Sequence, residues 1–237
     1  MDLGHFGKEY AGEKAIISLT SWKARINTVG LTIFNLLKTC PGFHIVLVLA
    51  EEEFPTKEAE LPKQLVAMAH AGLFEILWVE RNWKSFKKIL FTMEKYPSVP
   101  IISADDDCLY KFNYAEELLS NLPTSRPACV TYWCSNYKDS NYYNTAGYAT
   151  CFSPNYFSGA AHFVSDAVMP FNEDDMLYLA LRIKNNIQGC ICLHKSYNDV
   201  ASAHHEIDPL HNMYAKRTKA QRDAQIDNLV QILYSTP

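Results

Sequence analysis

The stretch "VPIISADDDCLY", residues 99–110, joins a short apolar run directly to three consecutive aspartates. A run such as Ile101–Ile102 between small residues is typical of a strand that is buried on both faces. Three adjacent carboxylates at the end of such a strand repel one another and lose solvation, so something is expected to compensate them. Water at an ordinary acidic turn or a bound metal ion could do so, and the stretch alone leaves both open.

Three further apolar runs precede this stretch, and each is also typical of a buried strand. They are "AIISLT" (15–20), "HIVLVLA" (44–50) and "FEILWV" (74–79). Apolar residues at helical spacing lie between the four runs and predict helices over 28–38, 62–71 and 85–96. Gly72 lies where a helix C-cap is expected, and Ser85 lies where an N-cap is expected.

Four strands that alternate with helices imply an α/β fold with a mostly parallel sheet, right-handed crossovers and helices on its flanks. In such sheets ligands bind beyond the carboxyl ends of the strands. The polar loops of this half each follow a strand, so all of them should open at the same edge. These loops are 20–25, 50–54, 80–85 and 105–107.

The second half of the chain is more irregular and is rich in aromatic residues between 131 and 163. Its tyrosine rings could stack on sugar faces, but an aromatic core with tyrosines at its rim explains the composition equally well. Helical patterns return at 172–186 and 219–234. No linker or internal repeat is visible, so the sequence indicates one domain, 1–237, with two halves.

The composition of the 237 residues, 48% apolar and 20% charged, is that of a soluble globular protein. A net charge of −4 gives no bulk reason to bind nucleic acid. Seven cysteines without a Cys-x-x-Cys pair indicate reduced thiols in a cytosolic protein. The N-terminus lacks a signal-peptide pattern, and no apolar run approaches the roughly 18 residues of a membrane span. We therefore expect a cytoplasmic protein, with peripheral association at the inner face of the cytoplasmic membrane left open.

Asp105 and Asp107 form an Asp-x-Asp pattern at a strand end, where an extended backbone points alternate side chains the same way. Mg²⁺ and Mn²⁺ prefer oxygen ligands and are commonly held by one or two carboxylates together with substrate phosphates. A metal ion would also remove the repulsion within the triplet. After a fourth parallel strand, the pattern favours a divalent metal site over a solvated turn.

Glu173, Asp174 and Asp175 form a second acidic group at the start of the 172–186 helix. Asn172 as an N-cap, and the complementarity between acids and the helix dipole, explain all three. A functional interpretation requires one of them to face the ligand edge as a general base. Spacing alone leaves both interpretations open.

Four basic residues lie at the start of the 85–96 helix: Arg81, Lys84, Lys87 and Lys88. Cations there oppose the helix dipole, which is easier to understand if an anion such as a pyrophosphate binds at the helix N-terminus. Lys84 is the better candidate because it lies in the loop proper. For Lys87 and Lys88 a solvated basic face is equally well supported.

The loop "LTSWKARI" offers Thr20, Ser21 and Arg25 as groups that could hold a base and a ribose. The chain has no Gly-x-Gly-x-x-Gly, no Gly-Lys-Ser/Thr and no Gly-x-Ser-x-Gly motif, which argues against dehydrogenases, P-loop enzymes and serine hydrolases. Three histidines could supply a further metal ligand, although lone histidines are more often structural: His204, His205 and His211.

Five segments, in this order, resemble bacterial GT-A-fold glycosyltransferases related to the large inverting family 2, of the kind encoded in capsule and lipopolysaccharide gene clusters. The segments are "IISLTSWKARINTVGLTIFNLL", "VLAEEEFP...ELP", "LFEILWVERNWKSFKKI", "PIISADDDCLY" and "FNEDDMLYLAL". The resemblance implies a GT-A, Rossmann-like fold with a nucleotide-binding half (14–107) and an irregular, aromatic-rich acceptor-side half (108–237). Compared with that family, several of the usual glycines of the 153–164 loop are replaced, and the C-terminal amphipathic or membrane segment that many relatives carry is not expected here.

The resemblance also implies roles for the two acidic groups. The family's Asp-x-Asp motif falls on the triplet, with Asp107 as the direct metal ligand and Asp105 facing the ribose or a metal-bound water. Asp106 lies between them at the nucleotide sugar. The family's x-Glu-Asp motif makes Asp174 the favoured catalytic base, and Asp175 is close behind because the acidic run leaves the register ambiguous.

The nucleotide is expected to contact the loops after the first three strands. By resemblance, Thr20, Ser21 and Arg25 would touch the nucleotide, and Lys84 would lie near the uracil or the diphosphate. The acid after the second strand, usually Asp in the family, falls among the glutamates that begin at Glu51, so its role is in doubt.

The implied activity is that of a glycosyltransferase of the hexosyltransferase type with Mn²⁺ or Mg²⁺ as cofactor. A sugar would pass, with inversion, from a nucleotide-diphosphate sugar, expected to be a UDP-sugar, to a hydroxyl of a growing cell-surface glycan or lipid-linked glycan. The segment 153–164 would line the donor sugar and the acceptor. Two alternatives are a non-catalytic sugar-nucleotide-binding relative and a nucleotidyltransferase, although the latter would normally show a glycine-rich loop after the first strand. The oligomeric state cannot be read from the sequence.

Overall fold

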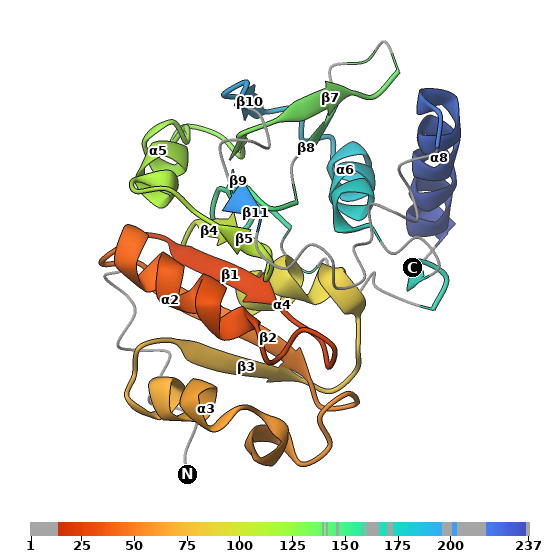
Figure 1. Ribbon diagram of the computed structural model, residues 1–237. Helices are drawn as coiled ribbons and strands as arrows, with labels where there is room; N and C mark the ends of the chain where they lie inside the picture. The colour runs from red at the N-terminus through yellow and green to blue at the C-terminus, as the bar shows by residue number, and fades with distance from the viewer. Residues whose placement is uncertain are drawn as a thin grey trace.

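The computed structural model describes residues 14–138, 140, 142–145, 147–157, 159, 166–169, 173–195, 201–202 and 217–235. A seven-stranded sheet runs through the centre of the molecule in the order β10-β6-β9-β4-β1-β2-β3 (Figure 1). Its strands are β1 (Ile16–Thr20), β2 (His44–Ala50), β3 (Glu75–Val79), β4 (Ile101–Ser103), β6 (Cys129–Thr131), β9 (Thr150–Phe152) and β10 (Cys190–Cys192).

The first four strands of the chain are parallel and form one side of the sheet. β1 pairs with β2 and with β4, and β2 pairs with β3. β9 runs antiparallel between β4 and β6, and β10 runs parallel to β6 at the edge. The predicted α/β fold with a mostly parallel sheet is therefore confirmed.

Helices cover both faces of the sheet (Figure 1). One apolar cluster joins the sheet to α2 (Val29–Thr39), α3 (Lys63–His70) and α5 (Tyr114–Ser120). A second cluster joins the other face to α4 (Lys87–Lys95), α6 (Asp174–Lys184) and α8 (Lys219–Ser235). Along β1, Ile17 and Leu19 belong to the first cluster and Ile16 to the second. Burial on both faces explains why the strands read as near-continuous apolar runs.

Two short ladders and two 3₁₀ turns complete the described elements. β5 (Cys108–Leu109) pairs with β11 (Ala201–Ser202), and β7 (Cys134–Asn136) pairs with β8 (Tyr143–Thr145). The 3₁₀ turns are η1 (Lys57–Glu60) and η2 (Lys84–Phe86). None of the helices in the described ranges combines the length and the apolarity that crossing a membrane requires.

The end of α3 follows the glycine signal in the sequence. Gly72 has φ +73°, which L side chains rarely adopt, and it follows directly after the C-cap residue Ala71. The Leu73 amide then donates to the Met68 carbonyl at 3.1 Å and closes the last turn. The prediction that the helix ends at this glycine is confirmed, with Gly72 as the residue directly after the C-cap.

The start of α4 differs from the prediction. Ser85 does not act as an N-cap, because it lies inside the 3₁₀ turn η2 and the α-helix begins two residues later at Lys87. Lys84 has φ +50°, a left-handed conformation that prevents a continuous helix from entering at this point. The loop after β3 therefore turns tightly before the helix, and this places Lys87 and Lys88 in its first turn.

The described aromatic residues of the second half mostly form core rather than surface. Tyr132, Tyr137, Phe152, Tyr156 and Phe157 are all buried, which confirms the aromatic-core interpretation for these five. The other expectations in this half are only partly covered by the structure. Residues 158, 160–165 and the three candidate histidines, 204, 205 and 211, lie outside the described residues.

Candidate active site

The Asp-triplet loop follows β4 at the carboxyl edge of the sheet and meets the loop after β1. Arg25 Nη1 donates to Asp106 Oδ1 at 2.8 Å and to Asp107 Oδ2 at 2.9 Å. Ser21 Oγ donates to Asp106 Oδ2 at 2.6 Å. Arg25, a cation of the protein itself, therefore compensates part of the negative charge of the triplet. The sequence alone predicts water or a metal ion in this role.

Burial governs the electrostatics of this contact. It raises the pKa of Asp106 above its ordinary value, although Arg25 and Ser21 act in the opposite direction. Burial also tends to lower the pKa of Arg25, but Asp106 and Asp107 outweigh it, so this pKa is raised. Both Asp106 oxygens accept bonds from the protein and fasten the loop. A contact between Asp106 and a nucleotide sugar stays a prediction.

Helix α2 fixes the backbone of the same loop. Thr32 Oγ1 lies 2.9 Å from the Asp106 carbonyl oxygen and 3.0 Å from that of Cys108. One turn further on, the Asn35 side chain bonds both backbone groups of Tyr110, at 3.2 Å to the carbonyl oxygen and 2.6 Å from the amide. The triplet is thus held by side chains of a neighbouring helix rather than left as a free turn.

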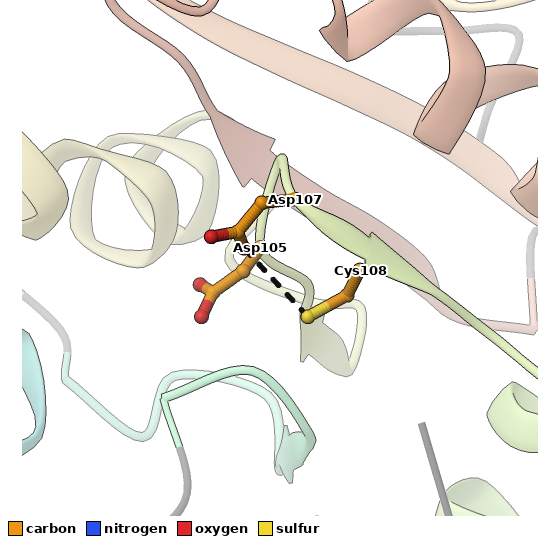
Figure 2. Close-up of side chains that lie close together, drawn as sticks. All are labelled: Asp105, Asp107 and Cys108. Atoms are coloured by element: carbon orange, nitrogen blue, oxygen red, sulfur yellow. Dashed lines mark hydrogen bonds between the residues drawn. The ribbon is translucent and has the colours of Figure 1, made fainter. Parts of the chain in front are cut away.

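Asp105, Asp107 and Cys108 form a group whose possible ligand atoms all lie within 4.8 Å of one another (Figure 2). The Asp105 side chain is 37% exposed, whereas that of Asp107 is 9% exposed. The Cys108 thiol donates to Asp107 Oδ1 at 3.7 Å. Two carboxylates at this spacing fit a hard cation such as Mn²⁺ or Mg²⁺. The assignment of Asp107 as the direct ligand stays a prediction.

Lys88 connects the triplet to the second acidic group. It lies in the first turn of α4 and is 2% exposed. Its Nζ donates to Asp105 Oδ1 at 2.6 Å and forms an ion pair with Asp174 Oδ2 at 2.7 Å. Burial tends to lower the pKa of Lys88, but Asp105 and Asp174 outweigh it and hold this pKa well above its ordinary value. The two acidic groups, remote in sequence, therefore share one ammonium group.

Asp174 is the first residue of α6, and its Oδ2 lies 2.7 Å from the Lys88 ammonium. Burial raises its pKa despite the nearby ammonium of Lys88, and a carboxylate with a raised pKa is suited to accept a proton from a hydroxyl. The backbone of Gly147 passes directly over it: a Cβ at Gly147 would lie 3.2 Å from Asp174 Oδ1. A larger residue at position 147 would therefore press on this carboxylate.

The neighbours of Asp174 have different surroundings. Asp175 Oδ1 accepts a bond from the Met176 amide at 3.0 Å, so this carboxylate supports the first turn of α6. Glu173 is the N-cap residue and lies 3.4 Å from Arg217 Nη1. Burial, together with Asp175, raises the pKa of Glu173 to about 7.

Lys87 and Lys88 are both buried, so a solvated basic face is wrong for these two residues. Lys87 Nζ donates to the Lys84 carbonyl at 2.9 Å and lies 4.0 Å from Glu53 Oε2. Burial lowers the pKa of Lys87 to about 8. The surroundings of Lys87 therefore lower its pKa, whereas those of Lys88 raise it.

The remaining nucleotide candidates lie in the loops as expected but are spread along them. Thr20 Oγ1 donates to the Val48 carbonyl at 2.7 Å, so it bridges β1 and β2. Glu51 pairs with Lys57 at 2.9 Å. Lys84 is exposed in η2. No ligand contact of these residues is tested by the structure.

Comparison with known proteins reveals the fold but no relative by sequence. No protein-family model matches the chain, and no characterised protein matches it in sequence. The mannosyltransferase PcManGT from Pyrobaculum calidifontis, solved with GDP-Man and Mn²⁺, aligns with a TM-score of 0.55 and 10% identity over 94% of this chain and 73% of its own. The chain has a glycosyltransferase fold. S. aureus TarS 1–349 aligns with a TM-score of 0.52 and 10% identity, over 93% and 71% of the two chains.

Within this glycosyltransferase fold, three site residues carried little signal in the sequence. The sequence does not distinguish Lys88 from Lys87. The spacing of apolar residues along a helix does not show which of two adjacent lysines lies next to two carboxylates. Cys108 follows the triplet, but a thiol is not a typical ligand for a hard cation. Gly147 lies in an irregular segment where no periodicity shows which side chain it approaches.

Proposed function

We propose that this chain is a metal-dependent glycosyltransferase that transfers a sugar from a nucleotide-diphosphate sugar to a hydroxyl group. The observation that carries the proposal is that Asp105 and Asp174 both form ion pairs with Lys88. These residues lie at the carboxyl edge of the sheet, in a chain with a glycosyltransferase fold. The proposed metal-binding carboxylate of Asp105 and the proposed base Asp174 then lie on either side of the Lys88 ammonium group. That arrangement suits a reaction in which a diphosphate leaves while a hydroxyl loses its proton.

Asp105 and Asp107 would hold the metal ion, Mn²⁺ or Mg²⁺. When bound, such a cation neutralises the charge that develops on the leaving nucleoside diphosphate. The Mn²⁺ in the PcManGT complex, together with the two carboxylates here, supports this part of the proposal. Arg25 keeps Asp107 in place, because its guanidinium pairs with that carboxylate as well as with Asp106.

Asp174 is the proposed base. It takes the proton from the acceptor hydroxyl while the hydroxyl oxygen forms a bond to the anomeric carbon and the bond from that carbon to the diphosphate oxygen breaks. The electron pair of the broken bond leaves with the diphosphate. Attack from the side opposite the leaving group inverts the anomeric centre. Asp175 is the less favoured base, because its carboxylate accepts a bond from the helix backbone.

For the donor we propose a UDP-sugar held by the loops after the first three strands. Thr20, Ser21 and Arg25 would contact the nucleotide, Lys84 the uracil or diphosphate, and Glu51 the nucleotide sugar. A GDP-sugar is the natural comparison, since PcManGT was solved with GDP-Man. The nucleotide-binding half (14–107) would provide these contacts.

For the acceptor we propose a hydroxyl of a growing cell-surface glycan, of the capsule or lipopolysaccharide type. The half comprising 108–237 would bind this acceptor, and peripheral association with the inner face of the membrane would bring a lipid-linked glycan within reach. This part of the proposal rests on the resemblance of the five sequence segments.

Thermal shift tests the nucleotide and metal requirement. The pure protein is heated with UDP, GDP, CMP or dTDP, with Mn²⁺ or with EDTA. A ligand at about 100 times its Kd adds about 2.7 kcal/mol to the free energy of unfolding, and we expect one nucleotide to do so only with Mn²⁺. Stabilisation in EDTA equal to that in Mn²⁺ would argue against metal-dependent binding. The absence of any stabilisation would reject the proposed function.

A further inference from the structure

We propose that Lys88 is a positioning residue whose single ammonium group sets the metal-binding carboxylate of Asp105 and the base Asp174 relative to each other. The inference rests on the proposed function and adds a residue to it. Lys88 is not expected to touch the substrate. It would act through two other side chains, one that serves the donor and one that serves the acceptor.

The geometry is that of a bridge between separate elements. Asp105 lies in the loop after β4, Asp174 begins α6, and Lys88 comes from α4, which packs against β1, β2 and β4. The ammonium nitrogen lies 2.6 Å from one carboxylate and 2.7 Å from the other. One ammonium group therefore contacts both carboxylates and fixes the distance between them.

The base of the bridge is rigid. The Lys88 carbonyl oxygen accepts bonds from Ser18 in β1 and, at 3.0 Å, from Thr92 one turn along α4. Ser18 Oγ and Thr92 Oγ1 also lie 2.7 Å apart. Because the lysine backbone is tied to the central strand, its side chain reaches the two carboxylates from a fixed point.

The two carboxylates differ in exposure, which indicates how the bridge would serve each. Asp105 Oδ1 is taken by Lys88, while the side chain is still 37% exposed and lies in the group that could hold a metal ion (Figure 2). Asp174 is 13% exposed, and Gly147 lies over it on another side. Lys88 thus orients a ligand on the open side of the site and a base on its closed side.

A plain structural salt bridge is the alternative, and Lys87 provides the matched control. It is the preceding residue, is equally buried and has its own carboxylate neighbour, Glu53, yet no described contact joins it to Asp105 or Asp174. A methionine at position 87 removes a buried ammonium from the same helical turn without removing the bridge.

The test compares Lys88→Met and Lys87→Met with the wild type in two measurements. Mn²⁺ affinity is measured by calorimetry without nucleotide, and kcat for donor consumption is measured at saturating Mn²⁺. For Lys88→Met we expect Mn²⁺ affinity to fall about 10- to 100-fold, as for other residues that orient a metal ligand, and kcat to stay at least about tenfold low when the metal is saturating. Lys87→Met should keep both properties within about threefold.

Each outcome decides the proposal. Loss of both properties in Lys88→Met alone supports it. Loss of neither, of only one, or an equal loss in Lys87→Met overturns the shared positioning role. If Lys88→Met does not fold, Lys88→Arg takes its place: the retained charge should keep Mn²⁺ affinity within about threefold, whereas the displaced charge should lower kcat at least about tenfold. A wild-type kcat in Lys88→Arg would overturn the proposal.

Failure of the proposed function looks different. In that case the wild type itself neither binds Mn²⁺ nor consumes a nucleotide sugar. Failure of the Lys88 inference leaves a wild type that does both, while Lys88→Met keeps at least one of the two properties or loses no more than Lys87→Met does.

Discussion

Lys87 and Lys88 are adjacent, equally buried and chemically identical, yet their surroundings move the two pKa values in opposite directions. Lys87 has one carboxylate at 4.0 Å, and burial lowers its pKa to about 8. Lys88 has carboxylates at 2.6 and 2.7 Å, and its pKa lies well above the ordinary value. At the scale of single residues, the site depends on the direction in which the first turn of α4 points each of the two ammonium groups.

A second residue-scale effect is testable away from the site. Burial alone would raise the pKa of Glu75, but bonds from His44, Lys95 and Tyr96 lower it to about 2. Because the folded pKa lies below the unfolded value, the stabilisation is present above the unfolded pKa and is lost as the pH falls through the folded pKa.

We therefore predict that Glu75→Gln lowers the free energy of unfolding by roughly 2–3 kcal/mol at pH 7. The difference from wild type should shrink to about half at pH 3, since the wild-type carboxylate is then becoming protonated in the unfolded state. Urea denaturation at pH 7, 4 and 3 measures it. A difference that stays constant across this range would show that Glu75 does not act through its charge.

At the scale of elements, the end of α3 depends on one backbone conformation. Gly72 has φ +73° and no heavy atom within 4 Å of an added Cβ, so a substitution there meets strain rather than a clash. Gly72→Ala should lower the free energy of unfolding by about 1–2 kcal/mol. Gly30→Ala in α2, also in open space but without a positive φ, should raise it by about 0.5–1 kcal/mol. Chemical denaturation separates the two, and equal effects would contradict this account.

The elements that the sequence predicts well are those with strong periodic signals. β2 matches the run "HIVLVLA" at both ends, because every residue after His44 is buried. β6, β9 and β10 have only three residues each, too few for an alternation to be recognised. They are placed by pairing with β4 and with one another, which the local sequence does not reveal.

The site follows the same division. Parallel topology predicts that the loops containing Ser21, Arg25 and Asp106 meet, and the structure brings these side chains into hydrogen-bonding contact. Topology does not predict that Lys88 reaches Asp174, because that contact depends on where α6 enters from the irregular half. The catalytic and ligand roles of these residues remain predictions until variants are assayed.

At the scale of the whole molecule, both halves contribute strands to one sheet, with β9 inserted between β4 and β6. The carboxyl edge of the first half therefore lies next to the start of α6 from the second half. Lys88 joins the two through its ion pair with Asp174. Under the proposed function, the first half would hold the donor and the second half the acceptor, so that the two meet at one carbon atom.

The most direct measurement is the release of nucleoside diphosphate from UDP-, GDP- and dTDP-sugars by the wild type and by Asp174→Asn. Water and a mixture of glycan hydroxyls serve as acceptors, with Mn²⁺ or EDTA present. We predict that one nucleotide sugar is consumed only with Mn²⁺, and that Asp174→Asn lowers kcat by about 10²- to 10⁴-fold while thermal stabilisation by the nucleotide with Mn²⁺ is retained. A wild type that binds a nucleotide but consumes no donor, or an Asp174→Asn variant with wild-type turnover, would contradict the account.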